Sequence, residues 1–222
     1  MDWTALWLSI KLGLFTVAIL LPLGILAGRW LAAANFRGKT LVEAAVALPL
    51  VLPPTVLGYY LLVAFGQASP LGQLWQGLTG RPLVFTFEGL LLASVIFNIP
   101  FAVQPMQRSF EAIAPEVREA AACCGMTPWT ALAKIELPLA WPGVLTAMVL
   151  SFAHTLGEFG IVLMVGGSIP GETRTIAVSI YDRVQAFDDV AAARMSALLL
   201  AISLVAIALT FAASARVGRR RG

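Results

Sequence analysis

Residues 119–143 read EAAACCGMTPWTALAKIELPLAWPG, a moderately polar and glycine-broken stretch inside a chain that is otherwise strongly apolar. Its turn signals predict two short helices. Pro115 opens the first helix and Gly125 ends it, because proline favours the first helical position and glycine the left-handed position after a helix. Thr127 followed by Pro128 starts the second. The stretch therefore predicts a helix, a sharp turn and a helix.

The residues around this stretch have the composition of a membrane protein. Hydrophobic residues make up 59% of the chain and charged residues 12%, about half the usual charged share of a soluble protein. The apolar residues come in blocks long enough for the about 20 residues that a transmembrane helix needs. We expect a single all-α domain over residues 1–222 with five transmembrane helices, at roughly 8–30, 43–66, 86–107, 142–166 and 192–214.

The segment 108–141 forms the longest loop between these blocks. Its second short helix is expected to end near Ile135, and Pro138 and Pro142 to mark the return into the membrane. No basic leader precedes the first block, and Arg29 follows it directly, so we expect a retained helix and not a cleaved signal peptide.

Basic residues are concentrated in the loops on one side of the predicted spans. Few lie on the other side, so the positive-inside rule predicts an outside N-terminus, a cytoplasmic C-terminus and a cytoplasmic 108–141 loop. The basic residues indicate topology and contact with anionic lipid, and we expect no nucleic-acid partner. The inner set comprises Arg29, Arg37, Lys39, Arg108, Arg118, Lys134, Arg216, Arg219, Arg220 and Arg221; the outer set comprises Lys11, Arg81, Arg174, Arg183 and Arg194.

Two ionisable residues fall inside the fourth block. His154 and Glu158 are spaced i,i+4, which predicts one helical face, and Phe159 follows directly. Such a pair is typical of half a metal site or of a proton relay; alternatively, the two side chains hydrogen-bond each other or a neighbouring helix. The chain has one histidine, and Cys123 and Cys124 are adjacent helix residues, so we expect no metal and no cofactor.

The second block contains its own break. Pro53 and Pro54 lack the backbone N–H group that a helix residue donates, and Gly58 follows four residues after Pro54. We expect a kinked helix that faces a transport pathway; a kink that serves packing alone is the alternative. Asn98 and Ser151 are interpreted as interhelical hydrogen-bonding residues.

The 108–141 segment also carries a spaced pattern: Glu-Ala-Ala, three residues, Gly, nine residues, Ile-x-Leu-Pro. This pattern resembles the EAA loop of permease subunits of bacterial ATP-binding-cassette (ABC) importers. The resemblance implies the type I importer permease fold and a coupling helix that docks on a separate ATP-hydrolysing subunit, so the chain itself is expected to be no enzyme. The matching, coupling-site residues are Glu119, Ala120, Ala121, Gly125, Ile135, Leu137 and Pro138.

Residues 48–66 and 152–181 look like the molybdate permease branch of that family, and the resemblance extends from about Trp7 to Ala212. It implies ATP-driven import of a tetrahedral oxyanion across the bacterial inner membrane. Molybdate is favoured, with tungstate and sulfate or thiosulfate as alternatives; sulfate permeases usually have an additional N-terminal helix. The pathway residues suggested by these matches and by the helix breaks are Pro53, Pro54, Gly58, His154, Glu158 and Phe159.

The predicted outer segments, about 67–85 and 167–191, are shorter than the roughly 50 residues that an independent capture domain needs. A separate periplasmic or extracellular binding protein is therefore expected to select the oxyanion. Five helices make a small bundle, so we expect a twofold homodimer with a pair of ATPase subunits. A stand-alone secondary transporter that uses His154 and Glu158 is the alternative from another class.

Overall fold

The computed structural model describes residues 1–219, and the side chains of residues 1–208 and 212. Arg220 and Arg221, counted above among the inner basic residues, lie outside the described residues. All regular secondary structure in the described part is helical, as predicted. The helices are α1 (Trp3–Ala33), α2 (Lys39–Val51), α3 (Pro54–Phe65), α4 (Pro70–Thr79), α5 (Phe87–Glu111), α6 (Pro115–Cys123), α7 (Pro128–Ala131), the π-helical turn η1 (Leu132–Glu136), α8 (Leu137–Gly157), α9 (Gly160–Gly166), α10 (Ile176–Gln185) and α11 (Asp189–Arg219).

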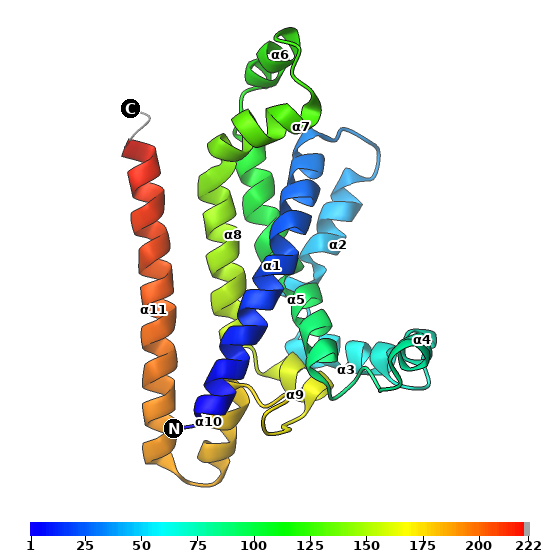
Figure 1. The fold of residues 1–222 in the computed structure, drawn as a ribbon, viewed down its shortest axis with the longest axis vertical. Helices are drawn as coiled ribbons and strands as arrows, with labels where there is room; N and C mark the ends of the chain where they lie inside the picture. Colours follow the sequence, from blue (N-terminus) through cyan, green and yellow to red (C-terminus); the bar gives the residue numbers. More distant parts are fainter. Residues whose placement is uncertain (220–222) are drawn as a thin grey trace.

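Helices α1, α5 and α8 form the centre of the bundle, and α11 stands along α8 (Figure 1). Small residues let the central helices approach closely. A Cβ atom on Gly28 of α1 would lie 2.9 Å from the backbone nitrogen of Gln107. A Cβ atom on Gly143 of α8 would collide with Ser109 and lie 2.6 Å from the carbonyl oxygen of Pro105. Such close backbone approach is typical of helices that pack in lipid, where small residues form the interface.

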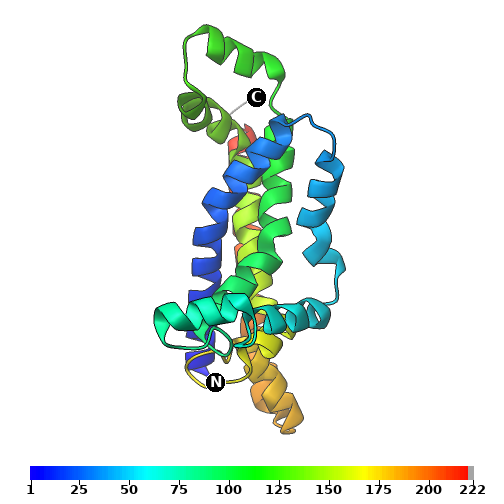
Figure 2. The ribbon, with the colours of Figure 1, turned by 90° about the vertical axis from the view of Figure 1, so that its right-hand side faces the viewer.

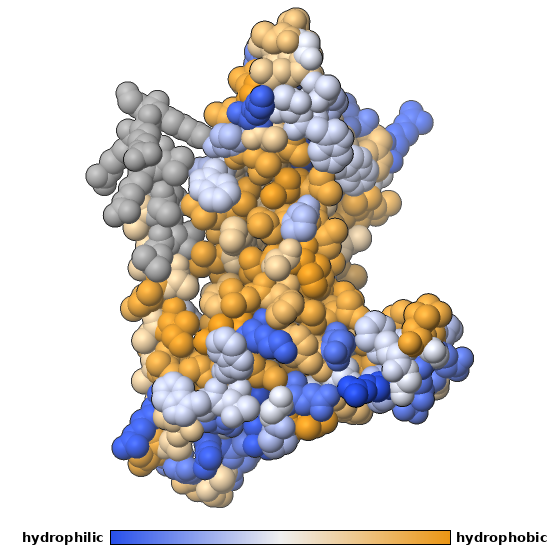
Figure 3. Space-filling view, in the orientation of Figure 1, coloured by the Kyte–Doolittle hydropathy of each residue, from blue (hydrophilic) through white to orange (hydrophobic). Residues whose placement is uncertain are grey.

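In the described part of the chain, four helices are long and apolar enough to cross a membrane: α1, α5, the continuous helix Pro128–Gly157 and the Asp189–Ala208 portion of α11. A fifth span is obtained within the described residues if α2 and α3 are counted as one broken span. Apolar side chains cover the middle of the face shown in Figure 3, and hydrophilic residues gather at both ends. The distribution fits a bundle whose middle lies in hydrocarbon.

The second predicted span, 43–66, is not one helix. Its chain leaves helical geometry at Leu52 and Pro53, and α2 and α3 meet at an angle of 106°. The reason is local: Pro53 and Pro54 both lack the N–H group that a continuous helix would donate. The predicted kink is confirmed, but it is sharp enough that α3 crosses the bundle while α2 runs along it (Figure 2).

The fourth predicted span, 142–166, has different boundaries from those expected. The second short helix does not end near Ile135; the chain stays helical from Pro128 to Gly157 and breaks only at Glu158 and Phe159. Pro138 cannot donate to the carbonyl group four residues earlier and would press its ring against that group. The wider π turn before it, closed by the Leu137 N–H donating to the Leu132 carbonyl, accommodates the proline without ending the helix.

The N-terminus and the last described turn of α11 lie at opposite ends of the bundle. Helices α6 and α7 occupy one end, together with the last turn of α1, the start of α2 and the final described turns of α11 (Figures 1 and 2). We call this the coupling end. The N-terminus, α4 and α10 lie at the other end, so the predicted outer segments, 67–85 and 167–191, each hold a short helix at that end. Which end faces the cytoplasm stays a prediction.

Candidate functional site

The turn between α6 and α7 has the geometry that its sequence predicts. Gly125 has φ +74°, in the left-handed region. The Gly125 N–H donates to the Ala122 carbonyl, and the Met126 N–H donates to the Ala121 carbonyl. These two bonds form a Schellman motif, which satisfies the last carbonyl groups of a helix and reverses the chain. Apart from its chain neighbours, no atom of the described residues lies within 4 Å of the place a Cβ on Gly125 would occupy, so the constraint is the backbone conformation.

The next helix begins as predicted. Thr127 precedes α7, and its hydroxyl accepts a hydrogen bond from the Thr130 N–H at 3.3 Å. Pro128 occupies the first helical position, where its missing N–H costs nothing. Helix α6, the turn, α7 and η1 together are called the coupling segment, residues 115–136.

The seven residues of the predicted coupling pattern do not share one face. Three are exposed at the tip (Glu119, Ala120 and Gly125), and Pro138 is exposed lower down. Ala121 is buried at 4% exposure, while Ile135 and Leu137 are half-buried. Ala121 therefore packs against its own chain, and Ala120 is the alanine of the pair that a partner can reach. The exposed tip offers a small surface with one carboxylate.

Sequence reasoning passed over the residue that fixes the base of this segment. Glu136 stands between the matched Ile135 and Leu137, and it is only 2% exposed. Its two carboxylate oxygens accept hydrogen bonds from Arg29 of α1 at 2.9 and 2.8 Å. Arg118 of α6 lies 3.6 Å from the same carboxylate. The sequence did contain a signal for this buried ion pair, because Glu136 is an acidic residue flanked by apolar residues just before a predicted membrane span.

The two breaks in the second and fourth predicted spans meet in space. A Cβ atom on Gly160, at the start of α9, would lie 2.9 Å from the Cβ of Pro54, at the start of α3. One turn on, a Cβ on Gly58 would lie 2.9 Å from the Cβ of Met164. Two predicted pathway residues of the second block, Pro54 and Gly58, thus pack against the start of α9, at Gly160 and Met164, which were not among the predicted residues.

Glu158 and His154 do not act as a pair. Glu158 ends α8 in extended geometry, and its side chain turns forward to accept a hydrogen bond from the Ile161 N–H of α9 at 2.8 Å. His154 stays in α8, where Nδ1 lies 3.1 Å from Oδ1 of Asn98 and the ring stacks on Phe101. The prediction of one shared helical face is wrong, because the helix ends between the two side chains. Phe159, in the break, packs its ring against Tyr181, with 4.7 Å between ring centroids.

Asn98 joins α5 to α8, as the sequence indicated. Its Nδ2 donates to the Ser94 carbonyl at 2.8 Å and to the Thr155 hydroxyl at 3.1 Å, and Ser94 accepts from Thr16 of α1 at 3.0 Å. These buried bonds link all three central helices. Because Nδ2 of Asn98 donates to Ser94 and Thr155, Oδ1 is left to accept a hydrogen bond from His154 Nδ1. No group of three or more metal-binding side chains gathers within the described residues.

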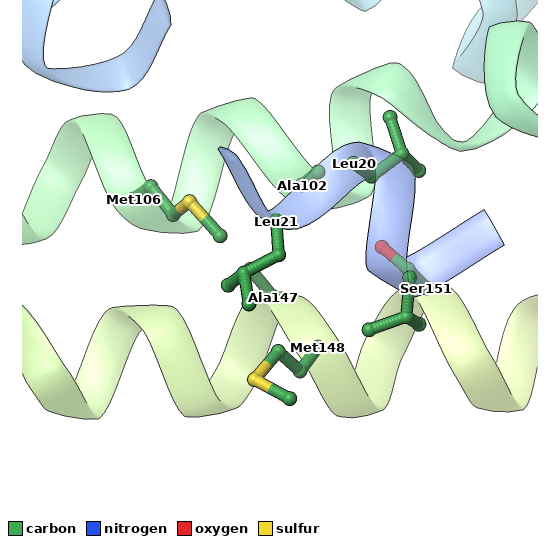
Figure 4. A pocket seen from close by; sticks show the side chains of 8 residues that line it. Leu20, Leu21, Ala102, Met106, Ala147, Met148 and Ser151 are labelled. Carbon is green, nitrogen blue, oxygen red and sulfur yellow. The ribbon is translucent and has the colours of Figure 1, made fainter. Parts of the chain in front are cut away.

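Ser151 was predicted to form an interhelical hydrogen bond, and this prediction is wrong. Its hydroxyl is buried and has no hydrogen-bond partner within the described residues. It borders a gap between α1, α5 and α8 that is otherwise lined by aliphatic and methionine side chains (Figure 4). The gap is too narrow for a water molecule. It is a packing defect and offers no room for a transported ion.

Comparison with known proteins identifies the family. The family model described as "Binding-protein-dependent transport system inner membrane component" matches residues 21–221. The molybdenum transport system permease protein of Azotobacter vinelandii is 50% identical over 187 residues, covering 84% of this chain and 83% of that protein. The corresponding protein of Escherichia coli K12 is 34% identical over 99% of this chain and 96% of its own length. A sulfate transport system permease protein of the same organism is 34% identical over 89% of this chain and 71% of its own length.

Solved structures match the fold. A chain of a bacterial ABC transporter involved in alginate import superposes with a TM-score of 0.77 at 16% identity, covering 96% of this chain and 78% of that one. A chain of an inward-facing methionine ABC transporter superposes with a TM-score of 0.71 at 18% identity, covering 97% and 94%. At these identities the likeness concerns the fold, which is that of type I importer permeases, as the sequence pattern implied.

Proposed function

The chain belongs to the family of binding-protein-dependent transport system inner membrane components, and we propose that it is the permease subunit of an ATP-driven molybdate importer. The observation that carries this proposal is the 50% identity to a molybdenum permease over most of both chains. A subunit of this family is a membrane transport component without catalytic activity of its own. ATP hydrolysis then belongs to a separate subunit.

Molybdate is favoured over sulfate as the transported oxyanion. The sulfate permease relative is less similar, and this chain covers a smaller share of it. Tungstate has the same charge and tetrahedral shape as molybdate, so it remains the competing substrate in any uptake assay. The selecting contacts are expected on a separate binding protein, which would dock at the end of the bundle that holds α4 and α10.

The ATPase subunit is proposed to dock on the tip of the coupling segment. Glu119 and Ala120 are exposed there, and Gly125 holds the turn that presents them. Arg29 contacts Glu136 of the coupling segment, and Lys39 begins α2 at the same end, so the positive-inside rule favours a cytoplasmic coupling end and an outside N-terminus. On this orientation the chain is a multi-pass protein of the bacterial inner membrane.

The transport pathway is proposed to lie between two copies of the chain. The gap between the central helices is too narrow even for water, so they enclose no route for an ion. Helix α2 buries only Pro49 and exposes large apolar side chains such as Leu41, Leu48 and Val51, which a second copy can cover. A twofold homodimer would place the α2–α3 and α8–α9 breaks near its axis, where the pathway would run.

The stand-alone secondary transporter has little support from the geometry. Such a mechanism would couple the titration of His154 to that of Glu158, but the two side chains bond to different groups, Asn98 and the Ile161 N–H. The geometry therefore favours the importer over the secondary transporter.

The decisive experiment compares two acidic residues of the same helix. Glu119 and Glu116 are both exposed on α6, but only Glu119 belongs to the coupling pattern. Glu119→Ala is expected to lower ATPase co-purification and ATP-driven uptake of labelled molybdate by about tenfold or more, the cost of truncating one partner of an interfacial charge pair. Glu116→Ala is expected to leave both unchanged. Parent-like binding and uptake in Glu119→Ala would contradict the proposal.

A further inference from the structure

Glu136 lies where the coupling segment joins the membrane bundle. Among the side chains that the structure describes, it is the one charged residue that is buried. Three elements meet at its carboxylate: η1, which carries it, α1 through Arg29, and α6 through Arg118. We propose that Glu136 is a positioning residue that makes the coupling segment and α1 move as one body during transport.

The contact with α1 is of the kind that fixes both distance and orientation. Arg29 places Nε 2.9 Å from Oε2 and Nη2 2.8 Å from Oε1 of Glu136, a two-point fork that a lysine could not reproduce. The same Nη2 lies 3.4 Å from the Pro128 carbonyl at the start of α7. Arg29 thus holds the coupling segment at both ends of the α7–η1 turn, although it is 107 residues away from Glu136 in the sequence.

The contact with α6 uses the second arginine. Arg118 donates from Nη2 to the Phe110 carbonyl, at the end of α5, at 2.8 Å. Its Nε is buried without a hydrogen-bond partner among the described residues and lies 3.6 Å from Oε2 of Glu136. The charge of Glu136 is therefore what compensates this buried nitrogen.

Packing alone holds α6 weakly. Of its nine residues, Ala121 is the one that is buried, and Val117 adds a partly buried contact with the cluster around Phe110 and Leu132. Helix α1, in contrast, runs the full depth of the bundle and packs against α5 and α8. A displacement of α6 consequently reaches α1 through the charged cluster more directly than through apolar contact.

The inference rests on the proposed function, because it assumes that an ATPase subunit moves α6. It adds a prediction that the function does not make: loss of the Glu136 charge should uncouple hydrolysis from transport without loss of ATPase binding. The tip of α6 that the ATPase is proposed to contact is left unaltered in such a variant, whereas the link from α6 to α1 is lost.

The test uses the complete complex, with ATPase and binding protein, in proteoliposomes. Labelled molybdate uptake and ATP hydrolysis are measured together for the parent, Glu136→Gln, Arg29→Lys and the control Lys39→Gln. Lys39 forms an ion pair with Glu43 at the same end of the bundle, but within a single helix. The readout is the number of molybdate ions imported per ATP hydrolysed, which a mere loss of folded complex does not alter.

We expect this ratio to fall about fivefold or more in Glu136→Gln, the equivalent of one ordinary stabilising interaction. It should fall in Arg29→Lys, which keeps the charge but not the fork, and stay at the parent value in Lys39→Gln. If Glu136→Gln does not assemble, Arg29→Lys decides. The inference would be overturned if each assembled variant of Glu136 and Arg29 kept the parent ratio, even with uptake and ATP hydrolysis reduced in parallel. Failure of the parent complex to import molybdate with ATP would count against the proposed function instead.

Discussion

Gly125→Ala tests the mechanical role of the turn between α6 and α7. Gly125 has φ +74° with open space where a Cβ would stand, so alanine meets no collision and pays only the strain of left-handed geometry. That strain is about 1–2 kcal/mol. Gly80, which ends α4 at the opposite end of the bundle, has φ +73° and equally open surroundings. Gly80→Ala is therefore a control with the same strain in a different place.

The assay is the affinity of the solubilised chain for its ATPase subunit, measured beside thermal unfolding. Both variants should lose similar stability, but only Gly125→Ala should weaken ATPase binding, by a factor of about 5–30 if the strain is relieved by opening the turn. Gly125→Asn should recover part of the loss, because asparagine tolerates left-handed geometry. Equal ATPase affinity in the two alanine variants would refute the reasoning, whichever value they share.

Three further predictions concern packing and topology. Gly143→Ala should destabilise the solubilised chain by about 1–3 kcal/mol, because its Cβ would lie 2.6 Å from the Pro105 carbonyl oxygen; an unaltered unfolding temperature would mean that α5 and α8 are not in such close contact. Asn98→Ala should cost about 0.6–2 kcal/mol, since its side chain joins α5 to α8; parent-like stability would contradict that link. A membrane-impermeant maleimide should label Cys123, which is exposed, in inside-out vesicles, and Gln185→Cys, in a chain without native thiols, in right-side-out cells. The reverse pattern would invert the proposed orientation.

Local signals in the sequence were sufficient to predict the turn between α6 and α7. Pro115, Gly125 and Thr127 each act on their own few neighbours, through a missing N–H, a left-handed backbone or a capping hydroxyl. Such effects are independent of the rest of the chain, and so the predicted first helix, the turn and the start of the second helix are confirmed. The apolar blocks were equally readable, since a length of uninterrupted apolar chain is itself the requirement for crossing hydrocarbon.

Prolines were a less certain guide than glycine. Pro53 with Pro54 breaks the second span, whereas Pro138 and Pro142 lie inside a continuous helix. A preceding π turn made the difference at Pro138. Whether a proline ends a helix depends on whether the neighbouring turn can widen to accommodate it. The presence of proline in the sequence does not show whether that turn can widen.

The sequence by itself determined that this chain is a helical membrane protein with a helix–turn–helix segment between two of its spans, because block length and turn residues are local properties. Only the tertiary structure decided that Glu136 meets Arg29, that His154 bonds to Asn98 and not to Glu158, and that the α2–α3 and α8–α9 breaks lie together. Those contacts join residues far apart in the chain. They exist because close packing of small residues brings particular helix faces together, and no single segment carries that information.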